Sequence, residues 1–121
     1  MKRRVRKPRI DTINAMIEQA ELGFNEKDIF TFIITLDTAG KKRYFGGIRL
    51  DTYDERRNRC VGTALGLDMI MQLMRVAGAR TWDEMVGRHV RVKKTATRVL
   101  AIGHFVKDQW FDPIDVIGEF D

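Results

Sequence analysis

The sequence predicts an α+β fold, a small antiparallel sheet or open β-barrel of five to six strands capped by one buried helix. Three observations lead to this prediction. Segments with alternating apolar residues are separated by short turn sequences, which favours hairpins and antiparallel pairing. One longer segment is apolar on almost every side, as a buried helix is. The chain has 121 residues, 44% of them hydrophobic and 32% charged, enough for one domain with its own core.

The first expected element, residues 10–24, fits two structures. Its apolar residues recur near helical spacing, and Asp11 or Thr12 can cap a helix start. Residues 15–24 can instead form an edge strand. The apolar positions in question are Ile10, Ile13, Ile17, Ala20 and Phe24.

A strand is clear over residues 29–36, where the residues that share the inward face are Phe30, Phe32, Ile34 and Leu36. The polar residues 37–42 predict a hairpin loop, and a second strand follows over 43–50 with Tyr44, Ile48 and Leu50 on one face. Gly46-Gly47 departs from strand preferences. The pair marks either a bend that closes a small barrel or room for a ligand against the backbone.

The buried helix is expected over residues 63–77, with Gly78 as its stop. Its polar positions, Asp68, Gln72 and Arg75, lie on one narrow stripe, so most of its surface is expected to be buried. The segment 81–84 has capping-box spacing, which predicts a one-turn helix to Gly87.

Two further strands are expected after the short helix. In the first of them, Val90 and Val92 alternate with polar residues. Earlier in the chain, the acidic residues Asp51, Asp54 and Glu55 are assigned to a turn. The last strand covers residues 98–106, and its shared face holds Leu100, Ile102, His104 and Val106.

Positive charge is concentrated at the N-terminus. The net charge is +5, and the first nine residues alone carry six basic side chains: Lys2, Arg3, Arg4, Arg6, Lys7 and Arg9. We therefore divide the chain into a basic tail, residues 1–9, and a single α+β domain, residues 10–121. Such a tail can bind nucleic acid through phosphate groups, contact a neighbouring subunit, or stay solvated.

An anion site is expected where the buried helix begins. Arginines precede this helix, and its first turn offers unpaired N–H groups and the positive end of the macrodipole. Basic residues beside aromatic ones, as in Arg43-Tyr44-Phe45, also suit a nucleotide. The expected ligand-binding residues are Arg49, Arg57, Arg59, Thr63, His104, Lys107, Trp110 and Phe111.

Signals for catalysis, metal binding and cofactors are poor. Two histidines and a single cysteine, Cys60, form no metal-ligand pattern, and no phosphate-binding glycine motif occurs. We therefore expect no enzyme, no metal and no cofactor. His89 is expected in solvent, whereas His104 is either a core-edge residue with one hydrogen-bond partner or part of a pocket with Lys107 and Trp110. The lone cysteine and the lack of a long apolar run favour a cytoplasmic protein without a membrane segment.

Several segments together resemble a family of small phage and prophage proteins. They occur in the family's order and span about 90 of the 121 residues: the run from Leu22-Gly23-Phe24 through Phe32, then Phe45-Gly46-Gly47, then the runs 59–66, 82–92 and 102–111. These proteins are in turn similar to the first Thoeris anti-defence family, which sequesters cyclic ADP-ribose-type signals uncleaved, as homo-oligomers with pockets between subunits.

The resemblance implies a phage-type, non-enzymatic homo-oligomer that works in the host cytoplasm. It implies that Arg57 or Arg59 and Trp110 or Phe111 grip the signal, and that residues 15–24 form a strand. The basic first nine residues depart from this family.

Two binding functions therefore remain open, beside a third in which the chain blocks a host enzyme as its partner and binds neither ligand. The first is sequestration of a small phosphorylated nucleotide, which counteracts host defence. The second is nucleic-acid binding by the basic tail and the hairpin 91–98, which holds Arg91, Lys93, Lys94 and Arg98. Deleting residues 1–9 separates them, because only the second function predicts weaker binding and a smaller salt dependence.

Overall fold

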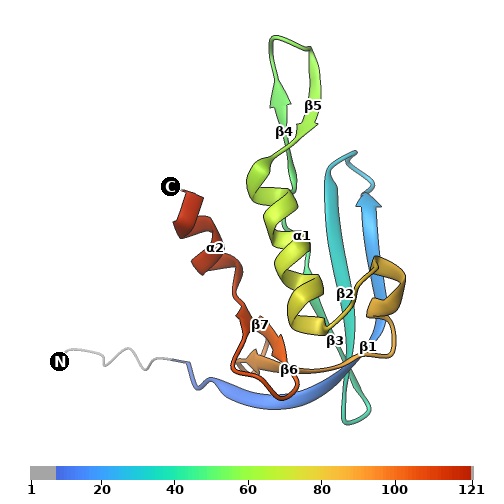
Figure 1. The fold of residues 1–121 in the computed structure, drawn as a ribbon, viewed down its shortest axis with the longest axis vertical. Coiled ribbons are helices and arrows are strands. Elements are labelled where there is room, and N and C mark those ends of the chain that lie inside the picture. Colours follow the sequence, from blue (N-terminus) through green and yellow to red (C-terminus); the bar gives the residue numbers. More distant parts are fainter. Residues whose placement is uncertain (1–7, 121) are drawn as a thin grey trace, which may run out of the picture.

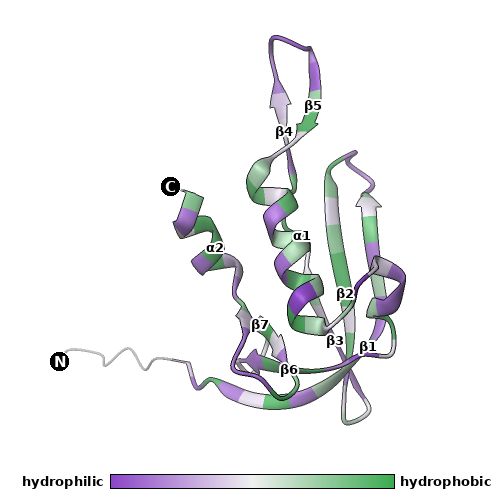
Figure 2. Ribbon diagram, viewed as in Figure 1, coloured by the Kyte–Doolittle hydropathy of each residue, from purple (hydrophilic) through white to green (hydrophobic). Residues whose placement is uncertain are grey.

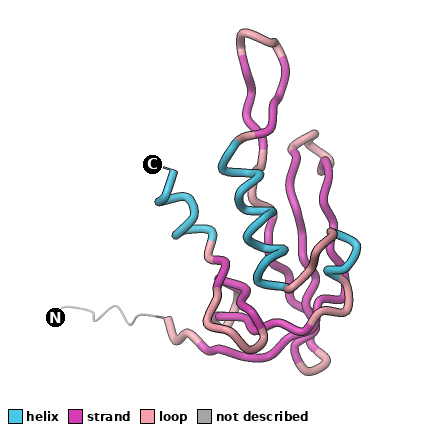
Figure 3. Tube along the Cα trace, viewed as in Figure 1, coloured by secondary structure: helices cyan, strands magenta, loops and turns pink. Residues whose placement is uncertain are grey.

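Residues 8–120 are described by a computed structural model, in which strands and helices make an α+β fold (Figures 1 and 3). Residues 1–7 of the predicted basic tail lie outside the described residues. In chain order the elements are β1 (Asp11–Phe24), β2 (Phe30–Thr38), β3 (Lys41–Gly46), β4 (Asp51–Asp54), β5 (Arg59–Gly62), α1 (Ala64–Ala77), the 3-10 helix η1 (Trp82–Met85), β6 (His89–Lys94), β7 (Val99–His104), β8 (Trp110–Phe111) and α2 (Pro113–Phe120).

Six strands form one open antiparallel sheet in the order β3-β2-β1-β6-β7-β8, and β4 and β5 form a separate two-stranded sheet. This arrangement confirms the predicted open antiparallel architecture. Helix α1 packs on β6, β7 and β8 and contacts α2 (Figure 1). No helix within residues 8–120 has the length and apolar character needed to cross a membrane.

Strand β1 lies at the centre of the large sheet, paired with both β2 and β6. The strand alternative for residues 15–24 is confirmed, whereas the helical alternative and the edge position are wrong. An irregularity between Ile17 and Gln19 shifts the pairing register. Ile17 lies opposite Leu36, and Ala20 lies opposite Ile34. Both therefore face the core, although residues three apart in a regular strand point to opposite faces. This irregularity makes a strand imitate helical periodicity.

The core fills the inner face of the sheet. Phe32, Ile34 and Leu36 are fully buried, which confirms the predicted inward face of β2. Val90 and Val92 of β6 are also fully buried, as predicted. The core is completed from the helices and the last strands by Met69, Leu73, Ile102, Phe111 and Val116.

Strand β3 is shorter than predicted and presents the opposite face. It ends at Gly46, and Tyr44 is exposed whereas Leu50 is buried, so the expected strand 43–50 with Tyr44, Ile48 and Leu50 on one face is wrong. Gly46 and Gly47 have φ angles of 124° and 75°, and the Gly47 N–H donates to the Phe32 carbonyl oxygen at 2.7 Å. A Cβ atom on Gly46 would overlap that carbonyl. The glycine pair therefore makes a bend, and the backbone that lies against it belongs to β2.

The polar segment after this bend forms a projecting hairpin, not a simple turn. We call β4, β5 and their turn, residues 51–62, the arm. It extends away from the large sheet, and hydrophilic residues occupy its tip (Figures 1 and 2). Tyr53 on the arm is 52% exposed.

Helix α1 has the predicted ends but not the predicted burial. Thr63 is its N-cap and Gly78, with φ 72°, is its C-cap. The sheet and Leu50 cover one side, which buries Gly66, Met69 and Leu73. Leu67 on the other side is 64% exposed. The helix is apolar all round but is covered on one side only.

The C-terminal third contains three further differences. The 3-10 helix η1 confirms the predicted short helix, but the Thr81 side chain makes no capping hydrogen bond, and Glu84 instead accepts the Arg80 N–H at 2.9 Å. Strand β7 ends at His104, so Val106 lies outside it and is exposed. Helix α2 was not predicted, because its eight residues hold too few turns for a clear periodic pattern.

Candidate nucleic-acid interface

The first turn of α1 is capped by a side chain of the chain itself. The Thr63 hydroxyl accepts the Gly66 N–H at 2.9 Å and donates to the Leu50 carbonyl oxygen at 3.1 Å. Thr63, which was expected to hold an anion, therefore serves as an ordinary N-cap.

The arginines of the predicted anion site lie along the arm and at its root. Gly62, beside the helix start, pairs with Asp51, whereas Arg59 pairs with Asp54 three residues further out. At a rise of about 3.3 Å per residue, three residues of strand place Arg59 about 10 Å from Gly62. Arg57 forms an ion pair with Asp54 at 2.5 Å. The structure does not gather these guanidinium groups at the first turn of α1.

Carboxylates of the chain engage two of these arginines. The side-chain hydrogen bond from Arg57 holds the pKa of Asp54 below its ordinary value, and backbone N–H groups of Arg57 and Arg56 act in the same direction. Arg49 donates to Asp51 Oδ1 at 2.9 Å, and the second oxygen of Asp51 is buried without a partner among the described residues. Arg49 and Arg57 are therefore already paired with carboxylates of the chain.

The second group of predicted residues lies at β7 and β8, at the other end of the molecule from the arm (Figure 1). His104 Nδ1 accepts the N–H groups of Val106 and Lys107 at 3.0 and 2.9 Å, so this side chain fixes a turn. His104 therefore accepts hydrogen bonds from two N–H groups, whereas one hydrogen-bond partner was expected. His89, by contrast, is exposed as predicted and lies against the Phe105 ring.

Both predicted aromatic residues make contacts within the chain itself. Lys93 Nζ and Arg91 Cζ lie 4.3 and 5.0 Å from the Trp110 ring centre. A Cβ atom on Gly103 would meet the same ring, which explains the glycine at that position. Phe111 is fully buried between Phe32 and Phe45. A ring without exposed surface does not stack on a ligand, so Phe111 is a core residue.

Three segments that are distant in the sequence meet at the end of the sheet opposite the arm. They are the chain entry at Pro8–Asp11, the start of β3 at residues 41–43, and the end of β6 with the β6–β7 turn at residues 94–98. Together they carry six basic residues that we call the cationic end: Arg9, Lys41, Lys42, Arg43, Lys94 and Arg98.

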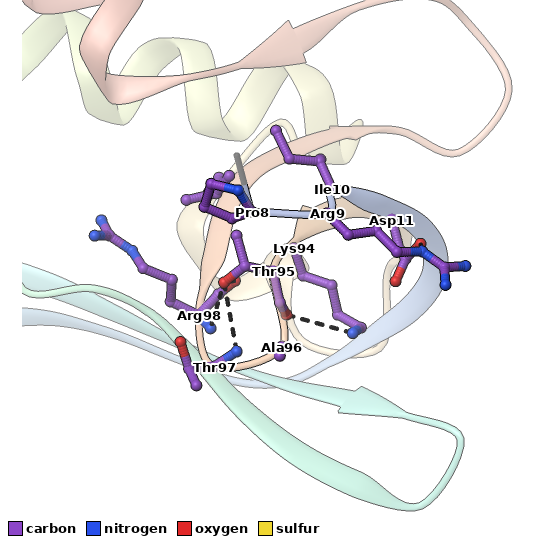
Figure 4. Close-up of a pocket in the computed structure, with 10 residues that line it drawn as sticks. Pro8, Arg9, Ile10, Asp11, Lys94, Thr95, Ala96, Thr97 and Arg98 are labelled. Carbon is purple, nitrogen blue, oxygen red and sulfur yellow. Dashed lines mark hydrogen bonds and ion pairs between the residues drawn. The ribbon is translucent and has the colours of Figure 1, made fainter. Parts of the chain in front are cut away.

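The β6–β7 turn is held by its own hydrogen bonds (Figure 4). The Thr95 N–H donates to the Arg98 carbonyl at 2.9 Å, and the Thr95 hydroxyl accepts the Arg98 N–H at 3.2 Å. The hydroxyl also accepts the Thr97 N–H at 3.4 Å. These bonds make the turn a defined platform for Arg98.

Hollows lie on both sides of this turn. One of about 830 Å³ is formed by the turn and residues 8–11, and the side chains of Arg9 and Arg98 extend in opposite directions from it (Figure 4). A second hollow of about 420 Å³ separates residues 96–99 from residues 41–44. A third of about 410 Å³ continues past Tyr44 toward α2. Arg98 lines all three hollows.

Positive charge exceeds negative charge at the cationic end. Arg9 pairs with Asp11 at 2.9 Å, and Lys42 pairs with Glu18 at 3.7 Å. Within residues 8–120 the other four cationic residues form no ion pair, and Arg43 donates to the Thr38 hydroxyl at 3.1 Å. The surface is therefore suited to an anion from outside the chain.

The sequence predicted part of this surface, because the hairpin 91–98 is one of the two segments expected to bind nucleic acid. It missed the contribution of Lys41 and Lys42, which were assigned only to a loop. The available signal was the run Lys41-Lys42-Arg43-Tyr44. Within the described chain, no group of three or more His, Cys, Asp or Glu side chains is placed to hold a metal ion.

Comparison with protein-family models, curated proteins and solved structures finds no match to this chain. The resemblance to small phage proteins and to the Thoeris anti-defence family, with the homo-oligomer it implies, therefore stays a prediction.

Proposed function

We propose that this chain binds nucleic acid, without catalysis, through the cationic end. The observation that carries the proposal is the meeting of six basic residues from three segments around the turn at residues 95–98. Phosphate contacts by Lys and Arg supply the sequence-independent part of nucleic-acid affinity. The chain enters the described fold at Pro8, beside the hollow of about 830 Å³, and the sequence before it adds Lys2, Arg3, Arg4, Arg6 and Lys7.

The spread of these cations favours a polymer over a single phosphate group. Lys41 and Arg98 line one hollow, and Arg9 and Lys94 line another on the far side of the same turn. A phosphodiester backbone presents one negative charge per nucleotide, so successive phosphates can meet successive basic residues. A helix terminus or a single arginine pair would instead hold one anion.

The experiment measures fluorescence anisotropy of a labelled oligonucleotide with the full chain over a range of salt concentrations. Changing Lys41 and Arg98 together to glutamine should reduce the slope of log K against log salt by about 1.4, because each lost contact to single strands removes about 0.7. Changing Arg56 and Arg59 on the arm to glutamine removes the same charge elsewhere and is the matched control. Equal effects of the two double variants would contradict the proposal.

A second candidate is sequestration of a small phosphorylated nucleotide that counteracts host defence. The hollow of about 830 Å³ supports it, because small-molecule sites have volumes of about 300–1,000 Å³ and this one has Arg9, Lys94 and Arg98 on its lining. Calorimetry with an ADP-ribose-type nucleotide, followed by mass analysis of the recovered ligand, tests this candidate. Tight binding of an intact nucleotide, unaffected by deletion of residues 1–7, would favour it over nucleic-acid binding.

A further inference from the structure

We infer that the nucleic acid is single-stranded and that Tyr44 stacks on one of its bases. The inference rests on the proposed function and adds the substrate class. Its starting point is the pair of hollows between β3 and the start of β7, which meet at Tyr44 and Arg98. We call these two hollows the seam groove.

Tyr44 is placed to present a ring face to a ligand. It lies on β3, an edge strand of the large sheet, opposite Thr35 of β2. Its side chain is 65% exposed, and it lines both hollows of the seam groove. Phe45, the next residue, is buried in the core and holds the strand in place. An exposed ring on an anchored strand is a suitable stacking platform.

Basic residues stand on both walls beside this ring. Lys41, Lys42 and Arg43 come from the start of β3, and Arg98 comes from the facing β6–β7 turn. Phosphates that pass between these two segments meet positive charge on either side. A base attached to that backbone can then lie on the Tyr44 ring.

The groove changes character beyond Tyr44. The third hollow is lined mainly by apolar side chains of three elements or their flanks, with Arg98 and Asp112 as its charged positions; the apolar residues include Ile48, Leu100, Ile114 and Ile117. A groove that is cationic at one end and apolar further along matches a strand with a charged backbone and unstacked bases. A duplex presents its charged backbone and the base edges in its grooves to such a surface.

A duplex cannot use this ring in the same way, because its base faces are covered by neighbouring base pairs. Trp110 and Phe111 are less exposed than Tyr44. Lys93 and Arg91 lie against Trp110, and Phe111 is buried. Tyr44 therefore provides the stacking surface, and the contribution it makes is specific to single strands.

The test compares an oligothymidylate single strand with a duplex of the same length, using Tyr44→Leu in the full chain. Stacking of one base on one aromatic ring corresponds to a loss of about tenfold in single-strand affinity, with duplex affinity unchanged. Tyr44→Phe keeps the ring and should bind as the unaltered chain does. Tyr53→Leu, at a tyrosine of similar exposure on the arm, is the matched control.

The outcomes separate the two proposals. Equal affinity of the unaltered chain for both forms, with no effect of Tyr44→Leu, would overturn the inference and leave nucleic-acid binding intact. Equal losses in Tyr44→Leu and Tyr53→Leu would also overturn it. Failure of the unaltered chain to bind either form would instead overturn the proposed function.

Discussion

Gly66→Ala is expected to destabilise the protein, although alanine is the better helix former. Gly66 lies in the first turn of α1, against the backbone of Leu50 at the root of the arm. A Cβ atom there would stand 2.8 Å from the Leu50 Cα and 2.9 Å from its carbonyl carbon. These backbone atoms cannot rotate aside, and the same Leu50 carbonyl accepts hydrogen bonds from the Thr63 N–H and hydroxyl.

The two opposing terms differ in size. Replacing glycine by alanine inside a helix favours folding by about 1 kcal/mol. Overpacking against fixed backbone costs about 1–3 kcal/mol, to which strain on the Thr63 cap adds. We expect a net loss of about 1–2 kcal/mol in the free energy of unfolding, which lowers the Tm by roughly 4–8 °C for a domain of this size.

Thermal unfolding followed by far-ultraviolet circular dichroism measures this change. Gly118→Ala in α2 is the control, since a Cβ atom on Gly118 meets nothing within 4 Å. That variant should be as stable as the unaltered chain or more stable by up to about 1 kcal/mol. A Gly66→Ala protein that melts at or above the temperature of the unaltered chain would refute the close contact between α1 and Leu50.

Three further predictions concern local structure. Thr63→Ala should lower the free energy of unfolding by about 1 kcal/mol, and Thr63→Ser should restore most of it, as denaturant unfolding can measure. Because the pKa of Asp54 is lowered in the folded chain, its ion pair with Arg57 contributes above the ordinary pKa and is lost as the pH falls through the lowered value. Carboxyl carbon titration by NMR should show this, with Arg57→Ala moving the pKa of Asp54 back toward its ordinary value. Gly103→Ala should displace the Trp110 ring, since a Cβ atom would lie 2.5 Å from it, and a change in the near-ultraviolet circular dichroism would report the displacement.

The sequence predicted elements whose signals are local. Strand β2 has uninterrupted alternation, and α1 has a threonine and a glycine at its ends, so both were placed correctly. Strand β1 was ambiguous because the irregularity after Ile17 moves Ala20 to the face that strict alternation would give to solvent. The side of α1 that stays exposed depends on how far the sheet extends, which no residue of the helix encodes.

The candidate site was harder to predict because its residues meet only in the folded chain. Arg57 and Arg59 are close in sequence to the helix start, but a hairpin carries them away from it. Lys41 and Arg98 are far apart in sequence, but the fold brings the start of β3 and the β6–β7 turn to one hollow. Spacing along the chain identifies single basic segments, whereas their convergence depends on strand order.

Mapping of backbone amide shifts by NMR tests the location of the binding surface most directly. On addition of an oligothymidylate, we expect the largest changes in residues 41–44 and 95–99, with little change on the arm. Changes concentrated at residues 56–59, or a spectrum that the oligonucleotide leaves unaltered, would contradict the assignment of nucleic-acid binding to the cationic end.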